Sequence, residues 1–240
     1  MKLSYLATKI EKIKNFKLAV NLRKKFILSF LLLVLIPFLA FGFGVYNQSK
    51  AIIEKNLYLY VSKSMKQAIK SIDYYLNEMD YISQIANTDA DFLKSLNSYK
   101  KLDVYERLEA TRKIDSILLN ISAQRSDIEG IYLFDFNYNL FYSKGKSPKH
   151  GYDYFQEKWF KDSILNDGKM HIVGTHIQHQ QDNTLSYVIS VSRLIKDYNT
   201  RKPLGVLLID INYKVFDRII DDDIGKAPSE GELYILDNSG

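Results

Sequence analysis

One uninterrupted apolar stretch, residues 26–46, constrains this chain more than any other feature. It reads FILSFLLLVLIPFLAFGFGVY and contains no charged side chain. An α-helix of this length extends about 31 Å, close to the thickness of a bilayer's hydrocarbon core, and buried helices of soluble domains are seldom apolar on every face. A cleaved signal peptide is the alternative, but its apolar core usually spans only about 7–15 residues. The stretch therefore predicts a retained transmembrane helix.

The charge before this stretch predicts its orientation. Residues 1–25 contain eight Lys and Arg residues and a single acidic residue, Glu11. Short basic flanks remain in the cytoplasm, so we expect a cytoplasmic tail at residues 1–25 and an extracellular segment at residues 47–240 of a cell-membrane protein. The formal charge of the whole chain is +5, which leaves the extracellular segment slightly negative. This balance argues against a nucleic-acid partner, which would require a basic surface.

Helical periodicity continues beyond the membrane. Residues 47–86 contain neither Gly nor Pro, and apolar side chains recur there every three or four positions. The pattern predicts a juxtamembrane helix continuous with the transmembrane one, whose apolar stripe packs along a domain and against a second copy in a homodimer. Such a helix can transmit a displacement, or it can serve as a plain stalk. Two further helices are predicted over residues 90–96 and 102–124.

After residue 127 the apolar pattern changes to alternation, which is typical of β-strands. This order of elements predicts an α+β fold, in which the transmembrane helix continues into a long helix that packs on an antiparallel sheet. The chain ends in a turn after the last strand, so we expect a fragment that stops inside a second subdomain, or an edge strand that closes the sheet. Strands are predicted at residues 128–136, 140–143, 171–177, 185–195, 205–211 and 232–237, and helices at 154–166 and 213–222.

Sequence features of catalysis and metal binding are weak. The chain contains no cysteine, and its four histidines occupy positions 150, 171, 176 and 179. His171 and His176 lie five residues apart on one predicted strand, so alternation places them on opposite faces and argues against a shared metal ion. Neither a G-x-S-x-G motif nor a P-loop occurs. We therefore expect no catalytic residue and no metal site within residues 1–240.

Several stretches resemble a known group of bacterial receptors. They are NLRKKFILSFLLLVLIPFLAFGF before and within the apolar run, WFKDSILNDGKMHIVGTH at 159–176, YVISVSRLI at 187–195 and KPLGVLLIDIN at 202–212. Together with the order of elements, they are similar to the double-Cache (dCache) domains of sensor histidine kinases, in particular the YesM-like group.

This resemblance implies how the chain is divided. A PAS-like, membrane-distal Cache subdomain would occupy residues 87–212, a connecting helix and linker residues 213–230, and the start of a membrane-proximal subdomain residues 231–240. A second transmembrane helix, a HAMP linker and a histidine kinase module would follow in the parent protein, with a response regulator as partner. ATP and Mg²⁺ would belong to that kinase module, so we expect no cofactor in the present segment.

The resemblance also implies a small-molecule pocket. Its amino-acid-binding members use an Arg two residues before a Trp, an aromatic pair, and an Asp that ends a GxxxxD strand. Trp159 and Phe160 match the aromatic pair and Asp210 matches the Asp, but Glu157 occupies the position of the Arg. An acid cannot clamp a carboxylate, so a sugar or another neutral solute is favoured over a free amino acid. The alternative is a core role for Trp159 and a local hydrogen bond for Asp210.

An Asp inside an otherwise apolar strand requires a reason, because burying a lone carboxylate is costly. Alternation places Val206, Leu208 and Asp210 on one face of their strand. Further candidate ligand contacts are aromatic and polar residues of the neighbouring strands: Tyr132, Phe134, Thr175, His176, Tyr187 and Ser190.

Three hypotheses about function follow from these features. The first is the extracytoplasmic sensing region of a two-component histidine kinase, which passes its ligand state across the membrane by helix displacement in a dimer. The second places the same sensor on a chemotaxis transducer or a cyclic-dinucleotide enzyme. The third is a membrane-tethered binding or adhesion protein without signalling output.

Overall fold

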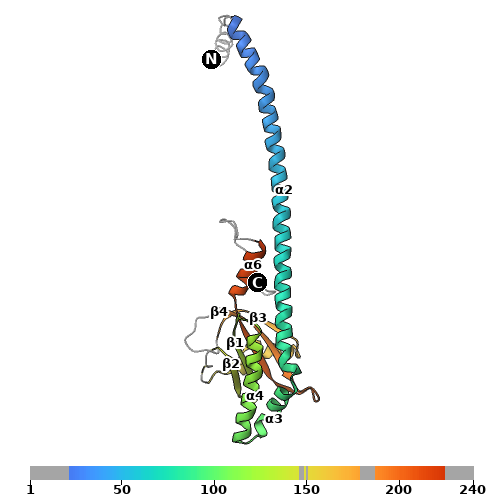
Figure 1. Ribbon diagram of the computed structural model, residues 1–240, viewed down its shortest axis with the longest axis vertical. Coiled ribbons are helices and arrows are strands. Elements are labelled where there is room, and N and C mark those ends of the chain that lie inside the picture. The colour runs from blue at the N-terminus through green and yellow to red at the C-terminus, as the bar shows by residue number, and fades with distance from the viewer. Residues whose placement is uncertain (1–21, 146–148, 150, 179–186, 225–240) are drawn as a thin grey trace, which may run out of the picture. The chain divides into compact units, whose positions relative to one another are not determined.

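The computed structural model describes residues 22–145, 149, 151–178 and 187–224. The chain divides into two compact units, Met1–Ser62 and Lys63–Gly240. Helix α2 (Leu22–Thr88) begins in the first unit and ends in the second, so the helices predicted at 26–46 and 47–86 form one continuous element (Figure 1). By length and composition, α2 is apolar enough to cross a membrane.

Two helices follow α2, and side chains fix the start of each. Helix α3 (Ala90–Ser98) begins at Asp89, whose carboxylate accepts a hydrogen bond from the Phe92 backbone at 2.8 Å. A short 3-10 helix, η1 (Tyr99–Lys101), leads to α4 (Val104–Ala123). Asp103 and Glu106 form a capping box there, each accepting from the other's backbone N–H, which satisfies amides that a helix start leaves free. Both helices confirm the predicted ones.

Five antiparallel strands form a single sheet in the order β2-β1-β5-β4-β3. Along the chain, the 3-10 helix η2 (Tyr154–Gln156) and helix α5 (Lys158–Leu165) lie between β2 and β3, and helix α6 (Lys214–Ile224) follows β5. The single helix predicted over 154–166 is thus two, because Glu157 has an extended backbone between them. The strands are β1 (Ile128–Asp135), β2 (Leu140–Lys144), β3 (His171–Ile177), β4 (Tyr187–Lys196) and β5 (Pro203–Asn212).

Several predicted segments lie outside the described residues. They are the basic tail up to residue 21, residues 185–186 of the fourth predicted strand, the strand at 232–237 and the second subdomain at 231–240. His150 and His179 lie outside them too.

One face of the sheet packs against helices. The C-terminal turns of α2, together with α3, α4 and the start of α6, bury apolar side chains on it, and Figure 1 shows α4 lying against the strands. Burial of such side chains supplies the main driving force of folding. The fully buried residues of this core include Met79, Ile114, Leu118, Ile131 and Ile209.

The opposite face carries a second, aromatic core. Helices η2 and α5 cover it, and the ring centroids of Phe134 and Trp159 lie 5.2 Å apart there. The Tyr154 hydroxyl donates to the Asp135 carbonyl at 2.8 Å, and the Ser163 hydroxyl on α5 is hydrogen-bonded to the Ser192 hydroxyl of β4 at 2.6 Å. Helices therefore cover both faces of the sheet. The predicted α+β class is confirmed, but the sequence pattern had predicted helices on one face only.

Candidate functional site

Asp210 lies near the C-terminal end of β5 on the face covered by α5, and its side chain is fully buried. The Ser190 hydroxyl on β4 donates to Asp210 Oδ1 at 2.5 Å, and Gln178 Nε2, just after β3, donates to Oδ2 at 2.9 Å. Hydrogen bonds of this kind compensate a buried carboxylate for the water it loses. The alternative of local hydrogen bonding for Asp210 is thus present in the structure.

His176 joins this cluster because β3 contains a β-bulge. His171 pairs with Ser192 and Val173 with Ser190, but the register shifts before His176, which pairs with Val188. One extra residue in a strand reverses the alternation beyond it. The prediction that His171 and His176 point to opposite faces is therefore wrong: both lie on the face covered by α5.

The contacts of His176 indicate how its ring is used. Nδ1 lies 2.8 Å from the Gly174 carbonyl, so this nitrogen carries a proton and donates it. Nε2 lies 3.5 Å from the Ser190 hydroxyl, whose own proton is given to Asp210. His171 is engaged elsewhere, with Nε2 3.7 Å from a carboxylate oxygen of Asp162 on α5.

Ser190, His176 and Asp210 are the residue types of a hydrolytic triad, but they are connected differently. In such a triad the imidazole lies between the carboxylate and the hydroxyl. Here the hydroxyl donates directly to the carboxylate, and the imidazole does not lie between the two. The arrangement suits recognition of a ligand better than nucleophilic attack. Within the described residues, no group of three or more His, Cys, Asp or Glu side chains could hold a metal ion.

Tyr152 connects the aromatic core with these polar residues. Its hydroxyl is buried, and among the described residues none lies within hydrogen-bond distance of it, although Trp159 and Glu157 are near. Burial raises the pKa of this hydroxyl above its usual range, and the nearby negative charges of Glu157 and Asp210 add to the rise, against a smaller opposing effect of Trp159. A buried hydroxyl left unbonded is costly, so this position calls for a partner.

A cavity of about 510 Å³ adjoins Tyr152. Glu157 also lines it, and its carboxylate lies near the Tyr152 hydroxyl. Lys149, Gly151 and Asp153 complete the described lining. The cavity, the Tyr152 hydroxyl and the Glu157 carboxylate together form the candidate site, and Asp210 is close enough to act on Tyr152 through its charge.

The structure gathers only part of the predicted set. Trp159 and Phe160 are both buried in the aromatic core, as the alternative for Trp159 held, and Trp159 also lies beside Tyr152. Tyr132 lies on the Asp210 face, but its ring stacks on Tyr142 of β2 at 6.5 Å.

Two predicted contacts lie away from Asp210. Tyr187 precedes Val188 on β4, so alternation places it on the face opposite to Ser190, and 52% of it is exposed. Thr175 lies in the bulge and is exposed.

The sequence analysis missed Tyr152 and Gln178. Tyr152 belongs to a Tyr- and Phe-rich run shortly before Trp159, which is a weak signal that could have drawn attention to it. Gln178 opens a polar turn and carries no signal of its own. Only the packing of β3 beside β4 brings it to Asp210.

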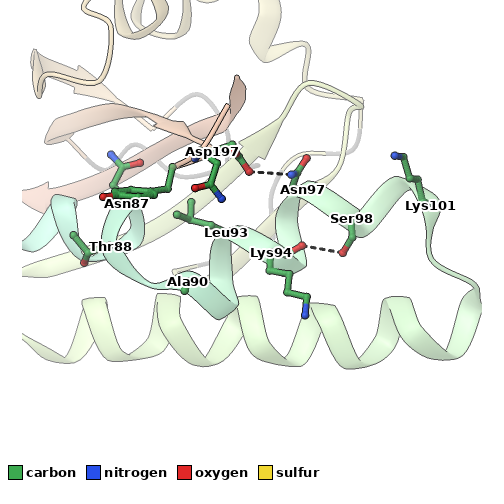
Figure 2. A pocket seen from close by; sticks show the side chains of 11 residues that line it. Asn87, Thr88, Ala90, Leu93, Lys94, Asn97, Ser98, Lys101 and Asp197 are labelled. Carbon is green, nitrogen blue, oxygen red and sulfur yellow. Dashed lines mark hydrogen bonds between the residues drawn. The ribbon is translucent and has the colours of Figure 1, made fainter. Parts of the chain in front are cut away.

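A larger cavity, of about 750 Å³, lies on the other side of the domain, between the end of α2, α3 and the β4–β5 turn (Figure 2). Several of its polar side chains are engaged by the protein itself. Asn97 donates to Asp197 at 3.0 Å, and the Ser98 hydroxyl donates to the Lys94 carbonyl at 2.8 Å, as the dashed lines in Figure 2 mark. Asn87 bonds the backbone of Lys196. With these groups satisfied, this cavity is the weaker candidate.

Comparisons with known proteins agree with this fold. The sequence profile of the Cache domain family matches residues 46–240. Among solved structures, the ligand-binding domain of the Campylobacter jejuni chemoreceptor Tlp3 in complex with L-norvaline has 18% identity and a TM-score of 0.50, covering 69% of this chain and 64% of that one. The Pseudomonas fluorescens chemoreceptor CtaA domain in complex with L-isoleucine has 15% identity and a TM-score of 0.49, covering 72% and 63%.

At these identities the likeness is one of fold alone, and the match spans less than two thirds of those domains. A search of curated proteins finds no match. The ligand named for the Tlp3 structure is an amino acid, so this comparison lends no support to the expected preference for sugars.

Proposed function

Because the chain belongs to the Cache domain family, we propose that residues 47–240 are the extracellular small-molecule sensing region of a membrane-bound signalling receptor. The supporting observation is the site beside Asp210, where an unbonded buried hydroxyl of Tyr152 meets a cavity and the carboxylate of Glu157. The apolar part of α2 supports the membrane anchor.

The proposed output is a histidine kinase that acts on a response regulator, with ATP and Mg²⁺ used by its kinase module. The support is the set of stretches that resemble YesM-like sensors, including the apolar run and residues 202–212. A chemotaxis transducer is the second candidate, because the solved structures of similar fold are chemoreceptor domains. Determining the sequence that follows residue 240 decides between a kinase module and a transducer module.

The chemistry of the site limits the proposed ligand. Glu157 lies at the cavity and Asp210 is close enough to act on Tyr152 through its charge, so a ligand carboxylate placed there would meet charge of its own sign. Carboxylates accept hydrogen bonds, and amines and hydroxyls donate them. We therefore propose a small solute that presents amine or hydroxyl donors to Glu157 and carries no carboxylate beside it. Amines and polyols are the classes to test, with free amino acids as the competing class.

The proposed mechanism is a shift between two arrangements of the domain in a homodimer. A ligand changes such an equilibrium only through its different affinity for the two states. The continuous helix α2 is the element that would carry the change toward the membrane.

Thermal-shift measurements on the full-length protein in lipid nanodiscs test this function. The probes are putrescine, choline, myo-inositol, glucose, L-isoleucine and GABA. We expect an amine or a polyol to raise the melting temperature, and Asp210→Ala or Glu157→Gln to weaken that binding at least tenfold. Asp217→Ala, at an exposed carboxylate on α6, is the matched control. A shift that survives both Trp159→Ala and Asp210→Ala would show that this site is wrongly placed.

A further inference from the structure

Resting on the sensing function proposed above, we infer that Arg193 is the positioning residue that couples the ligand-side helix α5 to helix α2. Arg193 lies on β4 and is 3% exposed. It is next to Ser192, but alternation sends the two side chains to opposite faces of the sheet.

On the α2 side, Arg193 binds two residues of one helical turn. Nε donates to the Ser83 hydroxyl at 2.8 Å, and Nη2 donates to the Asp80 carbonyl at 3.2 Å. Nη2 also forms an ion pair with the Asp80 carboxylate. Because the guanidinium is a rigid planar fork, these bonds fix the position of α2 as well as attract it.

The same guanidinium binds the turn that follows α5. Nη1 donates to the Gly168 carbonyl at 2.6 Å. This turn has a defined shape, since Asp167 and Gly168 both have left-handed backbones, with φ of 54° and 91°. One side chain thus joins Asp80 and Ser83 to Gly168, residues more than 80 positions apart in the sequence.

A second connection runs in parallel but is weaker. Lys196 donates to the Asp167 carbonyl at 3.0 Å and pairs with its carboxylate, while its backbone N–H donates to Asn87 at the end of α2. The Asp167 side chain is 78% exposed, and exposed ion pairs contribute little. Arg193 is therefore the buried link of the two.

Helix α5 connects this link to the candidate site. It carries Trp159, which lies beside Tyr152, and Ser163, whose hydroxyl is hydrogen-bonded to that of Ser192 at 2.6 Å. A displacement of α5 moves both its C-terminal turn, bonded to Arg193, and the strand position next to Arg193. An apolar side chain could fill this buried position without the cost of desolvating a charge, so the guanidinium points to a role in positioning.

Hydrogen exchange followed by mass spectrometry tests the coupling without any ligand. The full-length protein in lipid nanodiscs is compared with Trp159→Ala, Arg193→Lys and the double variant. The readout is the exchange rate of α2 residues 78–88 divided by that of α4 residues 104–123, which removes any global loss of stability. We expect Trp159→Ala to raise this ratio at least threefold in the wild-type background and by less than 1.5-fold in the Arg193→Lys background, because lysine keeps the charge but not the fork.

Arg125→Lys is the matched control. Arg125 also binds α2, through Glu78 at 2.6 Å and the face of the Tyr75 ring, but its remaining partner is Asp127 and not the α5 turn. The effect of Trp159→Ala is expected to remain in that background. If circular dichroism shows Arg193→Lys to be unfolded, Ser83→Ala replaces it, since this change removes one acceptor of the same guanidinium.

The proposal is wrong if Trp159→Ala leaves the α2 ratio unchanged, or if the rise persists in the Arg193→Lys and Ser83→Ala backgrounds. Because the hydrogen-exchange experiment uses no ligand, its result does not depend on whether the ligand screen succeeds. A loss of coupling likewise leaves the screen unaffected, so the two proposals fail separately.

Discussion

At the scale of single residues, Arg125 organises a second charged cluster on α2. Its guanidinium lies 2.8 Å from an Asp127 carboxylate oxygen and 4.5 Å from the centre of the Tyr75 ring. Burial acts to raise the pKa of Asp127, but the hydrogen bond and charge of Arg125 outweigh it, so this pKa is lowered. An acid with a lowered pKa stabilises the fold above its unfolded pKa and loses that contribution as pH falls through the folded pKa.

Asp127→Asn tests this contribution. We expect the variant to melt at a lower temperature than wild type at pH 7, because the charge-assisted bonds to Arg125 are lost. The difference in melting temperature between the two proteins should narrow as pH falls below about 4, the ordinary pKa of an aspartate, since the wild type then loses the same interaction. Thermal melts by circular dichroism between pH 7 and pH 2 measure it, with the exposed Asp217→Asn as control. A gap that stays constant over this range would contradict the assignment.

Residue identity predicted part of the candidate site. Asp210 was conspicuous because a carboxylate in an apolar strand needs partners, and Ser190 and Gln178 are those partners. Tyr152 escaped notice because a tyrosine is compatible with both core and surface, and only the packed structure reveals its unbonded hydroxyl. Tyr187 lies three positions before Ser190 on β4, and an odd separation along a strand puts two side chains on opposite faces.

At the scale of elements, the contact between β1 and β5 explains why a glycine occupies position 205, near the start of β5. A Cβ added at Gly205 would lie 2.7 Å from the Phe134 carbonyl oxygen and 3.3 Å from the Asp135 Cα. Both are backbone atoms of the paired strand, so neither can turn aside. The glycine permits the close approach that holds β5, and with it Asp210, in register.

Gly205→Ala is therefore expected to destabilise the domain. Overpacking of this kind costs about 1–3 kcal/mol, which lowers the melting temperature measured by circular dichroism. Gly42→Ala is the matched control, because no atom lies within 4 Å of a Cβ added there. Equal melting temperatures for Gly205→Ala and wild type would show that the strands can separate without cost.

Periodicity predicted the order and type of the described elements, because long amphipathic helices and alternating strands leave clear patterns. It did not predict the break at Glu157, where a single extended residue separates η2 from α5. Nor did it predict the layer formed by α5, since sequence does not say which face of the sheet a short helix covers.

At the scale of the whole molecule, the proposed orientation can be tested directly. The chain contains no cysteine, so one introduced thiol reports on one position. We expect Asn199→Cys, in the exposed β4–β5 turn, to react with a membrane-impermeant maleimide in intact cells, and Ser4→Cys to react only after lysis. The physical reason is that the basic tail stays in the cytoplasm. Labelling with the reverse pattern would place the domain inside the cell and remove the basis for an extracellular sensor.

The bulge in β3 has a practical consequence for anyone who wishes to redesign specificity. Counting every second position from His171 would select Val173 and Thr175 for a mutant library, and the Thr175 side chain faces away into solvent. Because the bulge adds one residue to β3, the next side chain on the face of His171 and Val173 is His176 and not Thr175. A library that varies residues 171, 173 and 176 would change the sheet face covered by α5, whereas the evenly spaced one would place one of its three varied positions in solvent.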